Sequence, residues 1–315
     1  MTNKNDKIFL AGHKGLVGSA IYRALLKNNY KNIITISKKK LNLLNQKKVF
    51  NFLNIKKPKI VIIAAARVGG IKANNKFRAD FIRENLVIQN NLIHGSYING
   101  IKKIIFLGSS CVYPKNYNKP IKEEYLLKGP LEYTNEPYAV AKIAGIKMCE
   151  SYNLQYKTNY LCLMPTNTFG PGDNYNSFSS HFIPAIIKKI YQAQLQKKNY
   201  IDLWGTGLPR REVIYVDDLA NAVIYFMNKK VRHSLINIGT SKDRSIREFA
   251  KLILKILNVK LKVKFDNDKK LDGIKRKVLD TNLARKYGWK PKIKLDDAIV
   301  KTYEELKRNF KKVRN

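Results

Sequence analysis

The chain has 315 residues, 44% of them hydrophobic, which is enough for a large core and argues against a disordered protein. Lysine and arginine outnumber aspartate and glutamate by 61 to 23, giving a net charge of +38. The cations are spread along the chain together with many asparagines and isoleucines, as the codons of an AT-rich genome would produce. The sequence contains no zinc-finger, RNP or basic-zipper pattern, so we expect no nucleic acid partner.

The N-terminus and the cysteines indicate a cytoplasmic protein. Residues 1–7 carry charge without an apolar segment or a cleavage site, and no later run is long enough to span a membrane. Cys111, Cys149 and Cys162 are odd in number and lack the spacing of metal ligands, which fits reduced thiols. We therefore expect neither a metal site nor a membrane partner.

The first element is an apolar strand at residues 7–11, followed by a turn that carries Gly12, Gly15 and Gly18 and by a helix over 19–27. Glycines between a strand and a helix let backbone N–H groups approach a pyrophosphate, whose charge the helix N-terminus favours. The GxxGxxG spacing differs from the GxGxxG of simple dehydrogenases. In this strand-turn-helix setting it still predicts a dinucleotide site.

The second strand, over residues 32–36, ends in Ser37 and three lysines, Lys38 to Lys40. Enzymes selective for NAD usually place an acidic residue here to bind the ribose hydroxyls. Hydroxyl and cationic groups favour the 2′-phosphate of NADP instead, although lysines on an exposed turn of a lysine-rich protein can also carry no function. The residues that follow, Leu41 to Leu43, are expected near the adenine.

Repeated strand and helix signals predict a doubly wound parallel α/β sheet, the Rossmann fold. Strands are expected at 60–65 and 103–107, with a long, doubly apolar helix over 74–97 between them. Ligands of such sheets bind at the carboxyl ends of the strands. Gly108, Ser109 and Cys111 fall at that edge.

Tyr138 and Lys142 lie four residues apart on a predicted helix over 138–156, so their side chains share one face. We expect the ammonium to lower the pKa of Tyr138 and make it a general acid, with Ser109 binding the same substrate oxygen. This spacing alone is common on helix surfaces. The spacing of Tyr138 and Lys142 indicates catalysis only if the glycine turn upstream binds a cofactor whose reaction needs a proton donor.

The second half predicts a smaller unit interwoven with the first. A strand over 160–164 opens into a Pro- and Gly-rich loop over 165–174, and a helix begins near His181. Further strands are expected before Trp204, over 209–218 and over 261–265. Further helices are expected up to 229, over 245–257 and over 295–307.

Five segments carry a resemblance to a known family: residues 11–19, 64–71, 107–115, 135–147 and 165–167. Together they resemble the extended short-chain dehydrogenase/reductase superfamily and, within it, the GDP-L-fucose synthases, which are GDP-4-keto-6-deoxymannose 3,5-epimerase/4-reductases. The resemblance extends over nearly the whole chain. It implies an NADP-binding Rossmann domain over 1–170 and about 212–240, and a nucleotide-sugar-binding α+β domain over about 171–211 and 241–315.

The resemblance also implies catalytic roles. Cys111 matches the family's base and His181 its acid for proton exchange at C3 and C5 of the 4-keto sugar. Tyr138 would donate a proton during reduction at C4, Lys142 would tune Tyr138 and hold the nicotinamide ribose, and Ser109 would bind the carbonyl oxygen. From the residues alone, a buried thiol and a hydrogen-bonded core histidine are the commoner interpretations of Cys111 and His181.

The binding residues implied by the resemblance fall into two sets. For NADPH they are Gly12, His13, Lys14, Gly15, Leu16, Val17, Gly18, Lys38, Asn42, Leu43, Ala64, Ala65, Leu107, Gly108, Ser109, Tyr138, Lys142, Pro165, Thr166, Asn167, Thr168 and His181. For the GDP-sugar they are Lys189, Trp204, Arg211 and Asp272, of which Asp272 is the weakest match because an insertion displaces the pattern.

Departures from the family leave alternatives open. Lys14 and Lys38 replace arginines, which loosens the expected preference for NADP because lysine lacks the bidentate fork. Differences at Thr168, Phe169 and Gly172 leave the sugar open, so a reductase of a GDP-4-keto-heptose, with or without epimerase activity, is an alternative. A non-catalytic dinucleotide sensor is more remote, because Tyr138 and Lys142 are present. The helices over 74–97 and 138–156 predict a homodimer.

Overall fold

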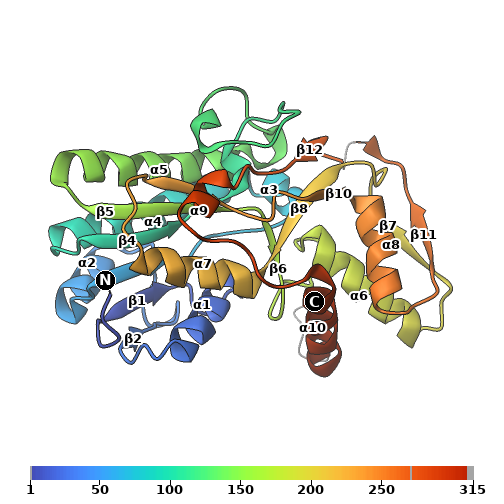
Figure 1. Cartoon of the computed structure of the whole chain (residues 1–315), viewed down its shortest axis with the longest axis horizontal. Coiled ribbons are helices and arrows are strands. Elements are labelled where there is room, and N and C mark those ends of the chain that lie inside the picture. The colour runs from blue at the N-terminus through green and yellow to red at the C-terminus, as the bar shows by residue number, and fades with distance from the viewer. Residues whose placement is uncertain (1, 270–271, 311–315) are drawn as a thin grey trace.

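The computed structural model describes residues 2–269 and 272–310. Its larger part is a six-stranded sheet in the order β2-β1-β3-β4-β5-β9, whose strand pairs are all parallel. Figure 1 shows helices on both faces of this sheet. The predicted doubly wound Rossmann sheet is therefore confirmed. Its strands are β1 (Ile8–Ala11), β2 (Ile33–Ile34), β3 (Ile60–Ile63), β4 (Lys103–Leu107), β5 (Asn159–Pro165) and β9 (Leu235–Ile238).

The central strands are apolar throughout because both faces of the sheet are covered. In β1, Ile8 and Leu10 pack in one core while Phe9 and Ala11 pack in the other, as the twofold period of a strand requires. The first core includes α1 (Leu16–Lys27) and α7 (Val216–Asn228). The second includes α2 (Gln46–Lys56), α4 (Arg78–Ile98) and α5 (Glu136–Tyr156).

Two elements of this part differ from the expectation. The single helix expected over 74–97 is divided into α3 (Ile71–Lys76) and α4, because Phe77 leaves helical geometry with φ −111° and ψ 42°. Helix α2 was not predicted, since only Val49 and Leu53 on it are buried and most of its other residues are polar. Its N-terminus is capped by Asn45, which accepts a hydrogen bond from the backbone N–H of Lys48.

The smaller part packs three helices against short strands around a third core (Figure 1). Strand β8 pairs with β6, β10 and β12, and β7 pairs with β11. Their bounds are β6 (Asn167–Phe169), β7 (Tyr200–Leu203), β8 (Arg210–Tyr215), β10 (Asp243–Ser245), β11 (Lys262–Phe265) and β12 (Arg276–Lys277). The helices are α6 (Phe182–Leu195), α8 (Ile246–Ile256) and α10 (Leu295–Asn309).

The chain crosses between the two parts several times. After β12, α9 (Asn282–Lys286) returns to the large sheet, where Ala284 and Trp289 join the core beneath α1 and α7. The domain boundaries given above stay a prediction. Within the described residues, no helix combines the length and apolarity needed to cross a bilayer.

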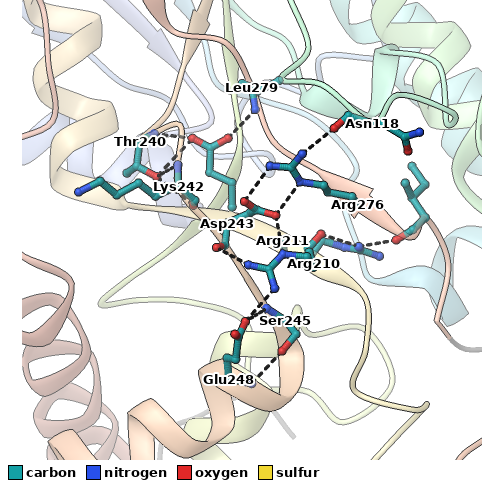
Figure 2. A network of polar contacts seen from close by, with 12 residues as sticks. Asn118, Arg210, Arg211, Thr240, Lys242, Asp243, Ser245, Glu248, Arg276 and Leu279 are labelled. Carbon is teal, nitrogen blue, oxygen red and sulfur yellow. Dashed lines mark hydrogen bonds and ion pairs between the residues drawn. The ribbon is translucent and has the colours of Figure 1, made fainter.

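Long-range polar contacts hold the small β8 sheet together. Figure 2 shows Asp243 of β10 between Arg210 of β8 and Arg276 of β12. Asp243 accepts from Arg210 Nε at 2.8 Å and from Arg276 Nε at 2.9 Å. Glu212 of β8 is fully buried and accepts from the backbone N–H groups of Ser241 and Leu279, each at 2.7 Å. Three strands distant in sequence are thereby fixed in one register.

Candidate active site

One cavity of about 1620 Å³ is lined by every residue proposed above for catalysis, cofactor binding or sugar binding. Pockets for a single drug-sized ligand hold roughly 300–1,000 Å³. This cavity therefore has room for a dinucleotide and a nucleotide sugar together. It runs from the carboxyl ends of the large sheet to the α6 and β8 region of the smaller part.

The dinucleotide end is formed by the turn between β1 and α1. Gly12 has φ +91°, and a Cβ there would lie 2.6 Å from the backbone nitrogen of Ala65. A Cβ on Gly18 would lie 2.0 Å from the carbonyl oxygen of Gly12. The N-terminus of α1 receives no side-chain cap. These features leave a bare backbone cradle at a helix N-terminus, which fits the pyrophosphate of a dinucleotide.

The adenosine end lies beside the turn after β2. Lys38 and Asn42 are exposed at the cavity edge, and Leu43 is half-buried beside them. Asn42 accepts a hydrogen bond from the backbone N–H of Leu44 at 3.1 Å, which shapes the turn. Lys38 supplies a positive charge at this turn, which carries no carboxylate, so the surface suits a 2′-phosphate.

Ser109, Tyr138 and Lys142 come together where β4 ends against α5. Lys142 is buried and donates from Nζ to the carbonyl oxygen of Leu107 at 2.8 Å. Ser109 follows that strand and accepts from the backbone N–H of Cys111 at 3.3 Å. Tyr138 packs edge to face against Phe81, with ring centroids 6.4 Å apart. Rigid elements therefore orient all three catalytic candidates.

The expected lowering of the pKa of Tyr138 is wrong. Burial raises the pKa of Tyr138 well above its ordinary value, the charge of Cys111 adds to the effect, and only the Ser109 hydroxyl opposes it. Burial also lowers the pKa of Lys142 to about 8. The ammonium faces the Leu107 carbonyl, with its nitrogen 5.9 Å from the centre of the Tyr138 ring. Desolvation thus dominates over charge attraction, and Tyr138 is a protonated donor at neutral pH.

Cys111 and His181 reach the same cavity from opposite parts of the protein. Cys111 lies in the short 3₁₀ helix after β4, next to Tyr138. His181 is the N-cap residue of α6 and opens into the cavity. Burial lowers the pKa of His181, and the positive charge of Lys277 lowers it further. Lys277 itself lies 3.4 Å from the Cys111 sulfur, measured from Nζ to Sγ.

The loop after β5 is fixed by the smaller part. The Thr166 hydroxyl and the Asn167 side-chain amide both donate to the carbonyl oxygen of Glu212, at 3.1 and 3.0 Å. Pro165 and Thr168 flank them on the cavity wall. The cavity wall that carries these proposed NADPH-binding residues is therefore attached to β8.

The proposed sugar-binding residues form the far end of the cavity. Trp204 is 45% exposed, with Lys189 Nζ 5.3 Å from its ring centre. Arg211 donates to the carbonyl oxygen of Asp272 at 3.0 Å, and burial lowers its pKa to about 10, so it is charged at neutral pH. The Asp272 carboxylate accepts from the backbone N–H and the hydroxyl of Thr206, at 2.8 and 2.7 Å. Asp272 is thus tied to the turn after Trp204 and is not a solvated loop carboxylate.

Three residues of this region are not predicted from the sequence to lie at the site. Lys72 on α3 lies 3.5 Å from the centre of the Trp204 ring and spans the two parts. Glu212 and Lys277 lie in strands whose pairing brings them to the site. A lysine among 61 basic residues carries no distinguishing signal. The only sequence hint for Glu212 is its position beside Arg211.

Comparison with known proteins agrees with this geometry. A sequence profile described as the NAD dependent epimerase/dehydratase family matches residues 8–239. The GDP-L-fucose synthase of Escherichia coli K12 is 44% identical over 308 residues, which cover 95% of this chain and 96% of that protein.

Two solved structures are also similar. A GDP-6-OMe-4-keto-L-xylo-heptose reductase from C. jejuni has 37% identity and a TM-score of 0.90, covering 98% of this chain and 99% of that one. A GDP-L-fucose synthetase from Naegleria fowleri bound to NADP has 26% identity and a TM-score of 0.90, covering 100% and 98%.

Proposed function

The chain belongs to the NAD dependent epimerase/dehydratase family, and we propose that it converts GDP-4-keto-6-deoxy-D-mannose into GDP-L-fucose by NADPH-dependent 3,5-epimerisation and 4-reduction. The observation that carries the proposal is the single cavity. It brings a thiol (Cys111), an imidazole (His181) and the Ser109, Tyr138 and Lys142 group to one place. Full-length similarity to GDP-L-fucose synthases supports the same substrate.

For the epimerisation, Cys111 and His181 are the proton carriers. The C4 carbonyl acidifies the hydrogens on C3 and C5, so a base of moderate strength can remove them. A thiolate and an imidazole are the two side chains that exchange protons near neutral pH with modest tuning. Cys111 takes the proton and His181 returns one. Ser109 and Tyr138 hydrogen-bond the oxygen that gains negative charge.

For the reduction, NADPH supplies the hydride that C4 receives. Tyr138 donates the proton to the C4 oxygen, and its raised pKa keeps that proton in place until negative charge develops there. Ser109 holds the same oxygen. Lys142, buried beside the Leu107 carbonyl, holds the nicotinamide ribose and supplies a positive charge near the phenol.

The cofactor is NADP(H). The glycine turn holds the pyrophosphate, and Lys38 together with Lys14 supplies the positive charge for the 2′-phosphate end. The solved GDP-L-fucose synthetase from Naegleria fowleri is bound to NADP, and its similarity to this protein covers 100% of this chain. Because both cations are lysines, we expect the discrimination against NAD to depend on charge more than on bidentate geometry.

A reductase of a related GDP-4-keto-heptose is the second candidate. The heptose reductase from C. jejuni shares the fold over nearly the whole chain, and it supports this alternative. A heptose reductase without epimerase activity leaves the hydrogens at C3 and C5 in place, whereas one with epimerase activity differs in the sugar that it accepts.

The decisive experiment is product analysis in D₂O with NADPH and GDP-4-keto-6-deoxymannose. We expect GDP-L-fucose with deuterium at both C3 and C5. NADPH consumption without deuterium at these carbons would contradict the epimerase and favour the reductase. Tyr138→Phe should lower the reduction rate by about 100-fold or more while solvent exchange and NADPH binding persist.

We also propose that two copies pair through the outer faces of α4 and α5. Ile98 on α4 and Val140 and Leu154 on α5 are large apolar side chains exposed by 39% or more. An isologous contact would bury these side chains on both copies at once. Light scattering at micromolar concentration should give a dimer mass, and a monomer mass would contradict the pairing.

A cytoplasmic location is part of the proposal. Cys111, Cys149 and Cys162 are free thiols in the structure, a state typical of reducing compartments. Cell fractionation should recover the protein with cytoplasmic markers, and recovery outside that fraction would contradict the assignment.

A further inference from the structure

Lys277 is a buried cation whose ammonium contacts the sulfur of Cys111. Its Nζ lies 3.4 Å from Sγ, and the residue is 7% exposed. Among the residues that the structure describes, no carboxylate lies within ion-pair distance of it. A buried ammonium without an anion is unfavourable, and a thiolate is the anion within its reach.

We propose that Lys277 is a positioning residue that stabilises the thiolate form of Cys111 and thereby equips Cys111 to remove the protons at C3 and C5. This inference rests on the proposed role of Cys111 and adds a residue to it. Lys277 touches neither the sugar nor the cofactor in this scheme. It acts through the sulfur.

The other groups around Cys111 agree with this role. Tyr138 faces it from α5 and is neutral at neutral pH, because burial raises the pKa of its phenol. Arg211 on β8 carries a positive charge and interacts electrostatically with Cys111. His181 approaches from α6, and burial lowers the pKa of its imidazole, with a further lowering by the positive charge of Lys277. Among these groups Lys277 and Arg211 are cations and none is an anion, and both cations favour the thiolate.

The proton balance follows from this charge arrangement. The thiolate accepts a proton from C3 or C5, and the electron pair of the broken C–H bond moves onto the C4 oxygen beside Ser109 and Tyr138. Once Cys111 is neutral, Lys277 has lost its anion, which favours release of the proton from sulfur to solvent. His181 takes a proton from solvent, and the same cation makes the resulting imidazolium a stronger acid. His181 therefore gives this proton to carbon as the electron pair returns from the C4 oxygen to form the new C–H bond.

The fold places Lys277 through its neighbours on β12. Side chains alternate along a strand, so Arg276 turns to Asp243, as Figure 2 shows, while Lys277 faces the cavity. Backbone pairing of β12 with β8 and the hydrogen bond from the Leu279 N–H to Glu212 fix this register. The polar network thus aims the ammonium at Cys111.

The test compares Lys277→Met and Lys277→Arg with the parent enzyme. The first readout is the pH dependence of Cys111 alkylation by iodoacetamide, located by peptide mass spectrometry. We expect Lys277→Met to move the midpoint upward by at least about one pH unit, which is a tenfold loss of thiolate below the midpoint. Lys277→Arg should restore most of it. Lys275→Met, an exposed neighbour with the same charge change, should leave it unaltered.

The second readout is deuterium uptake at C3 and C5, which should fall about tenfold or more in Lys277→Met at pH 7, with NADPH affinity unchanged. An unaltered alkylation profile and unaltered exchange in folded Lys277→Met would overturn the inference. If Lys277→Met does not fold, the parent decides: Cys111 that titrates at the same pH as glutathione also overturns it. Parental exchange in Cys111→Ser would instead overturn the proposed base, so the two failures are distinguishable.

Discussion

The two ends of the cavity are built in different ways. The dinucleotide end consists of backbone between Gly12 and Gly18, a turn whose parts are neighbours in the sequence. The sugar end consists of side chains that meet across long stretches of chain, such as Trp204 with Lys72 and Asp272 with Thr206. The first depends on close approach of the backbone, and the second on polar pairs.

This difference assigns different vulnerabilities to the two ends. Added volume in the turn disturbs the cofactor site but leaves the ion pairs of the β8 sheet intact. Loss of a charge in that sheet disturbs the sugar site and leaves the turn intact. Substitutions that affect one end without the other therefore test whether the two ends are independent.

The largest effect on ligand binding is expected for Gly18→Ala. The new Cβ would lie 2.0 Å from the carbonyl oxygen of Gly12, so the turn or the helix must move. Overpacking of about 1–3 kcal/mol corresponds to about 5- to 150-fold weaker NADPH binding. Fluorescence titration with NADPH measures it. Gly15→Ala is the matched control, because its Cβ would lie 3.6 Å from the same oxygen, an ordinary contact; equal losses in both variants would contradict the explanation.

The same contrast explains what the sequence predicts. Strand, turn and helix follow one another within the first 27 residues, so the glycine pattern in this setting predicts the cofactor end. The roles of Cys111, His181 and the sugar-binding residues required a family resemblance, because the residues near them in the sequence do not specify this chemistry. All of these residues line the cavity, and their roles stay predictions.

What the sequence could not predict depends on tertiary contacts. Lys277 and Glu212 have meaning only once β12 and β8 pair. The pKa of Tyr138 was predicted in the wrong direction, because spacing reveals the neighbouring ammonium but not how deeply the phenol is buried. Helix α2 was not predicted, because its apolar face is limited to two buried residues.

A second effect, at the sugar end, is expected for Glu212→Gln. One carboxylate oxygen accepts from the backbone N–H of Ser241 and the other from that of Leu279, so an amide keeps one acceptor but turns its NH₂ group toward the other N–H donor. We expect a loss of about 2–4 kcal/mol in the free energy of unfolding, since each unsatisfied buried group costs about 1–3 kcal/mol. Urea denaturation measures it. Exposed Glu124→Gln is the control for charge, and NADPH affinity of the folded variant should stay near the parent value.

A smaller, pH-dependent effect is expected for Asp243→Asn. Hydrogen bonds from Arg276 and Arg210 lower the pKa of Asp243 to about 2. The folded state therefore favours the carboxylate, and its contribution is complete above the unfolded pKa near 4 and lost as the pH falls toward 2. We expect the variant to lose about 1–2 kcal/mol at pH 7. Denaturation at several pH values should show the difference from the parent shrinking below pH 4; a constant difference would contradict the ion-pair explanation.

The smallest effect is expected for Lys72→Met, which tests whether the two ends are fully separate. Lys72 belongs to α3 on the side of the large sheet, yet its ammonium lies 3.5 Å from the centre of the Trp204 ring at the sugar end. A partly exposed cation–π contact of about 0.5–1 kcal/mol corresponds to about a 2- to 5-fold change. We expect the KM for the GDP-sugar to change by that factor while NADPH affinity stays constant. Lys76→Met on the same helix, whose ammonium faces Phe77 and Phe178, is the control. If Lys72→Met changed NADPH affinity as well, α3 would couple the dinucleotide end to the sugar end. The two ends would then not be independent at this helix.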